Sequence, residues 1–402
     1  MIIKETTAMN SSTPFDASFF DTGIYRIGTR CEKWDGHRPE DGDHVLPMWV
    51  ADMDFPSPPA CQEALLWRGA HGTYGYTEVL EDDSQALIDF WQRRHGLKLE
   101  KEHITTLPCV VTGLKLAIHA FTKPGDIVII QSPVYGPFRR SVEATGRKVA
   151  DSPLKRNEQG RYHMDWESLE NHLRQGARLM LLCSPHNPVS RLWSREELKQ
   201  LIQLLRRYGA KLAADEIHAD FTYAPGTFVS MLSLQEEGVV SFCAASKTFN
   251  LAGLQQATVL CKDPEMTSAL RSCIDSFGIV SGNMFALEAT RAAYTKGDAW
   301  LDGLLNYLTL CRQDVKELMA HHLPQVTVSP VEATYCAWFD LRTFGLSEEE
   351  LLARMIRAGV RLTAGSFFGQ EEGSGFFRMI FATPRRNIEQ GIERLARALK
   401  GT

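Results

Sequence analysis

An alternation of short apolar runs with amphipathic helical segments between residues 127 and 244 constrains the fold of this chain more than any other feature. The apolar runs span 127–131, 179–183, 211–214 and 239–244, and the helical segments span 136–146, 165–175 and 194–208. Strands that alternate with helices are typical of a parallel, doubly wound sheet with helices on both faces. The sequence therefore predicts an α/β fold in which ligands bind at the carboxyl ends of the strands.

The pattern changes after about residue 284, and this change predicts a second domain. The segments expected there are a helical stretch (284–323), three strands (326–329, 335–340 and 376–382) and a helix (347–358). A chain of 402 residues is also too long for one compact core. We therefore predict an N-terminal arm with part of a small domain over residues 1–60, a large domain over 61–290 and a small α+β domain over 291–402.

Three polar residues follow the apolar runs of the predicted sheet. Asp215 ends the run 211–214, Asn187 comes shortly after 179–183, and Lys247 follows 239–244. A lysine becomes a nucleophile toward an aldehyde when burial disfavours its ammonium form. Together the three match what an enzyme needs to hold pyridoxal 5′-phosphate (PLP): a Schiff-base lysine, a carboxylate for the pyridine nitrogen and an amide donor for the phenolate oxygen O3′.

Each of these residues also has an ordinary alternative. Lys247 could be a solvated surface charge, Asp215 a helix N-cap and Asn187 part of an Asn-Pro turn. The acids and histidine of 215–218 could suggest a metal site, but no second group stands at a ligand spacing, so we expect no metal.

Composition limits the remaining classes of function. The chain carries 44 Lys and Arg against 49 Asp and Glu, a net charge of −5. This balance argues against a nucleic-acid surface, which would show a basic stripe. The nine cysteines are scattered and lie mostly in apolar runs, which is typical of buried free thiols in a reducing, cytoplasmic compartment. We find no signal peptide and no apolar run long enough to span a membrane.

Five ordered segments carry a resemblance to a known family. They are 46–55 (LPMWVADMDF), 71–77 (HGTYGYT), 215–218 (DEIH), 246–255 (SKTFNLAGLQ) and 333–335 (ATY). From about residue 15 to 399 the chain resembles the fold-type I PLP-dependent enzymes of the aspartate aminotransferase superfamily. More narrowly, it is similar to the MalY/PatB type of cystathionine β-lyase, a C–S lyase.

The resemblance implies roles around the cofactor ring. Lys247 would be the Schiff-base lysine, Asp215 the partner of the pyridine nitrogen and Asn187 a donor to O3′. His218 stands where many aminotransferases carry a tyrosine that also bonds O3′, and Tyr135 matches the aromatic residue that stacks on the ring. A structural histidine and an ordinary loop tyrosine are the alternatives. Lys247, Asp215 and Tyr135 are the predicted catalytic residues.

The phosphate is expected on Thr112, Gly113 and Leu114, where a glycine opens an apolar helix. The N-terminus of a helix offers unpaired N–H groups and a positive dipole end to an anion. A glycine before a helix can also be only a cap. The resemblance adds the hydroxyl of Ser246, and Tyr76 from the neighbouring subunit of a homodimer.

Three residues are predicted on the substrate side. Arg378 lies inside an alternating strand and matches the arginine that binds the substrate carboxylate, for which a bidentate partner is natural. A structural ion pair is the alternative. The resemblance also suggests substrate contacts for Trp49 and Asp52, although Trp49 could instead be a contact between domains.

The chain departs from the family pattern at three places. Val189 and Ser190 replace the usual Thr-Gly after the O3′ asparagine, which leaves the geometry of that turn open. Ala244 and Gln255 stand where typical aminotransferases carry two phosphate ligands, a Ser or Gly and an Arg. Gln255 is what the β-lyase branch leads one to expect.

The predicted function is therefore a homodimeric PLP-dependent β-lyase. It would split cystathionine or cysteine S-conjugates into pyruvate, ammonia and a thiol. One alternative is an aminotransferase of class I/II, in which a keto acid closes the cycle. Another is a regulatory PLP-binding protein that acts through a protein partner.

Overall fold

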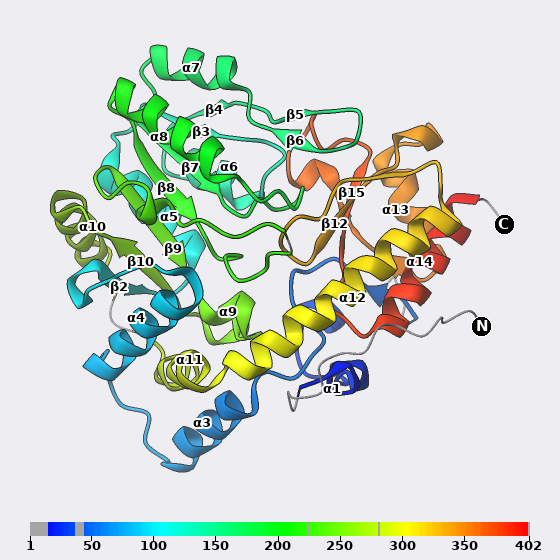
Figure 1. The fold of residues 1–402 in the computed structure, drawn as a ribbon, viewed down its shortest axis with the longest axis horizontal. Helices are drawn as coiled ribbons and strands as arrows, with labels where there is room; N and C mark the ends of the chain where they lie inside the picture. The colour runs from blue at the N-terminus through cyan, green and yellow to red at the C-terminus, as the bar shows by residue number, and fades with distance from the viewer. Residues whose placement is uncertain (1–14, 37–43, 224, 280–281, 401–402) are drawn as a thin grey trace.

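The computed structural model describes residues 15–36, 44–223, 225–279 and 282–400. Within this part of the chain, seven strands form one sheet in the order β2-β10-β9-β8-β7-β3-β4 (Figure 1). The strands are β2 (Ile104–Leu107), β3 (Ile127–Ile130), β4 (Lys148–Asp151), β7 (Leu179–Cys183), β8 (Lys211–Asp215), β9 (Val239–Cys243) and β10 (Ala257–Cys261). The run from β4 to β9 is parallel, which confirms the predicted doubly wound sheet. Only the pairings of β10 with its two neighbours are antiparallel in the described sheet.

Apolar residues on both faces of this sheet explain the continuous apolar runs. In β7, Leu179 and Leu181 belong to one hydrophobic cluster, and Met180 and Leu182 belong to the other. Successive side chains of a strand point to opposite faces, so a strand covered on both sides is apolar throughout. The helices on the first face are α5 (Val110–Phe121), α6 (Pro137–Ala144) and α10 (Pro264–Ser276), and those on the second face include α4 (Glu81–His95), α7 (Trp166–Arg174) and α8 (Arg195–Tyr208).

The second half of the chain forms a smaller sheet. Its described strands lie in the order β11-β12-β15-β14, all antiparallel. They are β11 (Thr327–Val328), β12 (Cys336–Asp340), β14 (Thr363–Ala364) and β15 (Phe376–Ile380), covered by α13 (Glu348–Arg357) and α14 (Arg385–Lys400). Figure 1 shows the long helix α12 (Asp298–His322) running from the large sheet toward the small one.

The N-terminal segment lies beside the small sheet, where the N–H of Ile380 in β15 bonds the carbonyl oxygen of Met48. Strand β1 (Leu46–Pro47) pairs in parallel with β13 (Val360–Arg361). The assignment of residues 1–60 to the small domain and the boundaries at 60 and 290 stay predictions. Residues 1–14 of the predicted arm lie outside the described residues. The remaining helices near this segment are α1 (Ala17–Thr22), α2 (Glu32–Asp35) and α3 (Pro59–Ala70).

The predicted helical stretch from 284 is two helices, α11 (Met284–Lys296) and α12. The break falls at Gly297, where an added Cβ would lie 2.6 Å from the Phe249 ring and 2.4 Å from the carbonyl oxygen of Ala293. Only a glycine allows this close approach. No described helix is long and apolar enough to cross a membrane.

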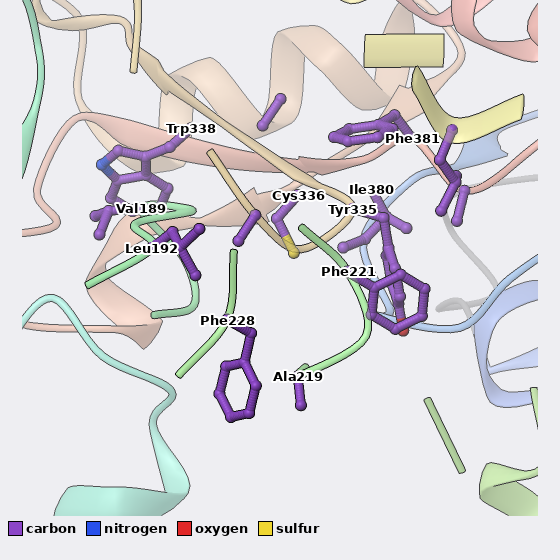
Figure 2. Packing of buried hydrophobic residues seen from close by; sticks show 14 of the residues in the cluster. Val189, Leu192, Ala219, Phe221, Phe228, Tyr335, Cys336, Trp338, Ile380 and Phe381 are labelled. Atoms are coloured by element: carbon purple, nitrogen blue, oxygen red, sulfur yellow. The ribbon is translucent and has the colours of Figure 1, made fainter. Parts of the chain in front are cut away.

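One hydrophobic core connects the loops of the large sheet to the small sheet. The ring of Phe221 packs edge-on against Tyr335 with centroids 4.8 Å apart. Figure 2 shows these two side chains together, with Val189 and Trp338 lining the same junction. Close-packed interiors of this kind have low compressibility and resist deformation. The site residues on both sides of the junction are therefore held in one rigid frame.

Candidate active site

The three residues predicted from the strand ends lie at neighbouring strands of the large sheet. Asp215 ends β8, opposite Cys183 of β7 and Phe242 of β9 in the strand register. Asn187 lies in the loop after β7, and Lys247 lies in the short helix α9 (Ala245–Thr248) after β9. The carboxyl ends of parallel strands are where open α/β sheets bind ligands.

Lys247 has the environment that a nucleophilic amine needs. Its Nζ donates a hydrogen bond to the carbonyl oxygen of Ala51 at 2.6 Å. Burial lowers the pKa of the Lys247 amine, although the nearby Asp52 carboxylate acts in the opposite direction. Burial disfavours the ammonium form and makes the neutral amine accessible. The surface-charge alternative for Lys247 is therefore wrong.

Asp215 is a buried carboxylate with one backbone donor. It is 6% exposed and accepts a hydrogen bond from the N–H of Ile217 at 3.1 Å. Burial raises the pKa of the Asp215 carboxyl to about 6. Among the described residues no side-chain cation forms an ion pair with it, and no helix begins at Asp215, so the N-cap alternative is wrong. A cationic group brought to this carboxylate would hold it ionised.

Arg378 and Asn187 are joined directly. Nη1 of Arg378 donates to Oδ1 of Asn187 at 3.0 Å, and Nη2 donates to the carbonyl oxygen of Trp49 at 2.7 Å and to Oγ1 of Thr363 at 3.3 Å. Nε of Arg378 is buried without a hydrogen-bond partner in the described part of the chain. Burial lowers the pKa of the guanidinium. These acceptors are all neutral, and no ion pair of Arg378 is found among the described residues, so the arginine retains its capacity for a carboxylate ligand.

His218 and Tyr135 are the two remaining residues predicted around the cofactor ring. His218 is 3% exposed, its Nδ1 is buried without a described hydrogen-bond partner, and burial lowers the pKa of its imidazole to about 3. The ring is therefore neutral and has a nitrogen left to bond a ligand. Burial raises the pKa of the half-buried Tyr135 phenol, which also lies close enough to feel the charges of Arg378 and Asp215.

The predicted phosphate loop requires a correction. Helix α5 begins at Val110 after the cap residue Cys109, so Gly113 does not open it. The free N–H groups of a helix belong to its cap and first three residues, here 109–112. Thr112 can therefore contribute an N–H and a hydroxyl, whereas the N–H of Gly113 bonds Cys109 and Leu114 lies one residue further into the helix. Gly113 serves packing instead, because a Cβ there would lie 2.6 Å from the Phe242 ring.

Ser246 and Tyr76 occupy very different places. Ser246 is half-buried in α9, one residue before Lys247. Tyr76 is fully exposed, at 108% of the reference area, in the coil between α3 and α4. The single chain does not bring Tyr76 into the site, so its predicted contact with the phosphate depends on a second subunit.

The segment 48–55 passes beside Lys247 and Arg378. The carbonyl of Trp49 accepts from Arg378, while its indole N–H donates to the carbonyl oxygen of Lys33 at 3.2 Å. The carboxylate of Asp52 pairs with Arg26 at 2.6 Å. Both residues therefore lie near the site, and their contacts with substrate stay predictions.

Sequence reasoning missed a buried ion cluster behind this segment. Asp54 is 2% exposed and pairs with Lys33 at 2.6 Å and with Arg26 at 3.1 Å. The charge of Lys33 keeps the pKa of the Asp54 carboxyl low in spite of burial. A second acid two residues after Asp52 inside an apolar segment was the signal that could have revealed it.

The turn after Asn187 keeps the left-handed geometry that glycine usually provides. Ser190 has a φ of 56°. Its hydroxyl lies 2.8 Å from Oγ1 of Thr334 and donates to the carbonyl oxygen of Cys336 at 2.7 Å. These bonds to the small sheet offset the strain of a non-glycine residue in this conformation. Gln255, another of the departures, also has a positive φ, of 58°.

The charges and protonation of three side chains show that the site suits PLP. An uncompensated Asp215, a neutral His218 with a free Nδ1 and a lysine of lowered pKa match the pyridine nitrogen, the phenolate and the aldehyde of this cofactor. No described group of three or more His, Cys, Asp or Glu side chains could hold a metal ion. The doubly wound sheet together with this site defines a PLP-type enzyme of fold type I.

Comparison with known proteins gives the family. The profile described as aminotransferase class I and II matches residues 50–395, and the chain belongs to this family. It is 38% identical to cystathionine beta-lyase PatB of Bacillus subtilis over 94% of this chain and 99% of PatB. The structure of cystalysin from Treponema denticola, which contains PLP, aligns with a TM-score of 0.91 and 30% identity over 95% of this chain and 98% of cystalysin. The PLP-bound C-S lyase from Staphylococcus hominis aligns with a TM-score of 0.87 and 27% identity over 94% and 98% of the two chains.

Proposed function

We propose that this protein is a PLP-dependent β-lyase that cleaves the C–S bond of cystathionine or related cysteine S-conjugates. The products are pyruvate, ammonia and a thiol. The observation that carries the proposal is that a lysine of lowered pKa, an aspartate with no ion-pair partner and an arginine with only neutral partners lie together in a chain 38% identical to PatB over nearly its whole length.

The residues that would hold the cofactor follow from the contacts of the site. Asp215 would hold the proton on the pyridine nitrogen, and Asn187 and His218 would bond the phenolate oxygen. The N-terminal N–H groups of α5 and the hydroxyl of Ser246 would receive the phosphate. Lys247 would hold the aldehyde carbon. When bound, PLP withdraws electrons from Cα of the amino acid and so weakens the bonds to this carbon.

The protein's own part in the reaction is to orient and to move protons. Arg378 binds the α-carboxylate, because its remaining N–H donors have no charged partner among the described residues. Lys247, as a free amine, takes the proton from Cα. The Cβ–S bond then breaks, the electron pair leaves with the sulfur, and the released aminoacrylate reacts with water to give pyruvate and ammonia.

A direct assay tests this function against its alternatives. Purified protein is incubated with L-cystathionine and no keto acid, and pyruvate and free thiol are followed. Steady release over many turnovers supports the lyase. Release that stops after one equivalent and resumes with 2-oxoglutarate would identify an aminotransferase instead. No turnover with any thioether amino acid or keto acid, despite bound cofactor, would favour the regulatory function.

We also propose that the working form is a homodimer. Large apolar and aromatic side chains are exposed on α3 and on the coil before α4: Leu66, Trp67, Tyr74, Tyr76 and Leu80. Such a patch is typical of a protein interface. It would bring Tyr76 to the partner's phosphate, and light scattering together with Tyr76→Phe tests this arrangement.

All nine cysteines lie in the described residues as free thiols, which supports the proposed cytoplasmic location.

A further inference from the structure

The free amine of Lys247 is held by the main chain of segment 48–55. Its Nζ donates to the carbonyl oxygen of Ala51 at 2.6 Å, and the hydroxyl of Tyr335 donates to the same oxygen at 3.3 Å. This carbonyl is therefore the acceptor that positions the free amine. The catalytic use of Lys247 requires that free form.

The side chain of Asn250 fixes the residues that follow Ala51. Its Oδ1 accepts from the N–H of Met53 at 3.3 Å. Its Nδ2 donates to the carbonyl oxygen of Met53 at 3.1 Å and to that of Phe55 at 2.8 Å. We call this set of three hydrogen bonds the Asn250 clamp. It joins two stretches of chain that lie about two hundred residues apart, with a sequence separation of 197 for the Met53 bonds.

The same residue ends the helix that carries Lys247. Asn250 follows α9 and its cap Phe249 with a φ of 57°, and the N–H of Leu251 bonds the carbonyl oxygen of Ser246 at 2.9 Å. This is the Schellman pattern, in which the left-handed position takes glycine or asparagine. Glycine could end the helix equally well but has no amide to clamp segment 48–55. Asparagine serves both purposes.

We propose that Asn250 is a positioning residue that holds the Ala51 carbonyl where it receives the free amine of Lys247. It acts through segment 48–55 and not by touching substrate. The inference rests on the proposed function in one respect, namely that Lys247 takes the proton from Cα. By accepting a hydrogen bond from the ammonium, the Ala51 carbonyl opposes the effect of burial and lets Lys247 keep that proton.

Three variants separate the clamp from its surroundings. Asn250→Gly keeps the left-handed helix end and removes the clamp. Ser57→Ala is the matched control, because it removes only the hydrogen bond from Ser57 to the Asn250 carbonyl, 3.0 Å long. Tyr335→Phe removes the second donor to the Ala51 oxygen and leaves the clamp in place.

The main measurement is the pH midpoint for acylation of Lys247, followed by peptide mass spectrometry in the full-length chain after removal of cofactor. Asn250→Gly should lower this midpoint by about one pH unit, the scale of a hydrogen bond to a charged group. Ser57→Ala should leave it unchanged, and Tyr335→Phe should raise it, since the amine no longer shares its acceptor.

The holoenzyme gives a second measurement. In Asn250→Gly, kcat for L-cystathionine should fall about tenfold with KM within about twofold, and the α-deuterium isotope effect should increase, because proton abstraction becomes slower. A wild-type midpoint in Asn250→Gly, or no rise in Tyr335→Phe, overturns the proposal. The midpoint needs no lyase activity, so failure of the clamp is distinguishable from failure of the proposed function.

Discussion

Arg378 donates a hydrogen bond to the side-chain oxygen of Asn187 at 3.0 Å, and this bond joins the predicted substrate anchor to a predicted cofactor ligand. Because the amide oxygen of Asn187 faces Arg378, the Nδ2 group is the part of the amide left to donate to a ligand. The bond thus orients both side chains before anything binds.

Arg378→Ala should raise KM for every amino-acid substrate by about a hundredfold, because it removes a charge-assisted bidentate contact. Arg378→Lys should recover only part of this loss, since an ammonium lacks the planar fork. Arg342→Ala is the control: this arginine pairs with Asp340 of the small sheet and is more than half exposed. Equal KM values for Arg378→Ala and wild type would show that Arg378 does not bind the substrate carboxylate.

Lys247→Ala should abolish turnover and the visible absorption band that borohydride bleaches in the wild type, because it removes the amine of lowered pKa that follows β9 at the strand ends. The absorbance spectrum before and after reduction checks this. Lys155→Ala, which removes an exposed partner of Asp165, should behave as wild type. Normal activity in Lys247→Ala would show that another residue carries the cofactor.

Asp215→Ala should retain some cofactor but lose roughly 10²-fold or more in kcat, the scale expected when a preorganised charge is removed. The structural reason is that burial makes this carboxylate dependent on a cationic partner. Asp165→Asn is a suitable control, since Asp165 caps helix α7. An almost unchanged rate in Asp215→Ala would mean that the carboxylate only orders the turn at Ile217.

The strand-end residues could be predicted from the sequence because their signals are local. Lys247 and Asp215 each end or follow an apolar run, and the parallel topology places such ends at one edge of the sheet. The start of α5 was misplaced because Gly113 looks like a helix opener, whereas its role is contact with Phe242. That contact depends on a strand far away in sequence.

Other features depend on distant partners and left no local pattern. The clamp of Asn250 reaches Met53 and Phe55 across the chain. The antiparallel pairing of strand β10 was not predicted, because an apolar run does not reveal the direction of its neighbours. Tyr76 was assigned through a resemblance, and the single chain leaves it exposed.

Gly113→Ala should destabilise the fold by about 2 kcal/mol, the usual cost of forcing an extra group into a packed contact. The added methyl would meet the Phe242 ring at 2.6 Å. Urea unfolding measures the change, and Gly253→Ala is the control because nothing lies within 4 Å of its added Cβ. If Gly113→Ala is as stable as Gly253→Ala, α5 does not pack tightly on β9.

Glu216 should make the stability of the protein depend on pH. It is 1% exposed, accepts hydrogen bonds from Ser230 at 2.9 Å and from the N–H of Met231 at 2.7 Å, and burial raises the pKa of its carboxyl from 4.5 to about 7. Between these values the folded state binds more protons at this group than the unfolded state. The free energy of unfolding therefore falls as pH rises from about 4.5 to 7, by up to about 1.4 kcal/mol per unit from this group.

Glu216→Gln keeps an acceptor for Met231 and a partner for Ser230 but cannot titrate. Urea unfolding of the holoenzyme at pH 5, 6 and 7 should therefore show a smaller decline in stability for this variant than for the wild type. Asp215 contributes a decline of the same sign wherever it lacks a cation, because burial also raises its pKa, to about 6. The comparison is therefore made with saturating cofactor, whose pyridinium would hold Asp215 ionised, so that the difference between the two proteins reports Glu216. Identical slopes for wild type and Glu216→Gln would show that Glu216 is already ionised in the fold at pH 5.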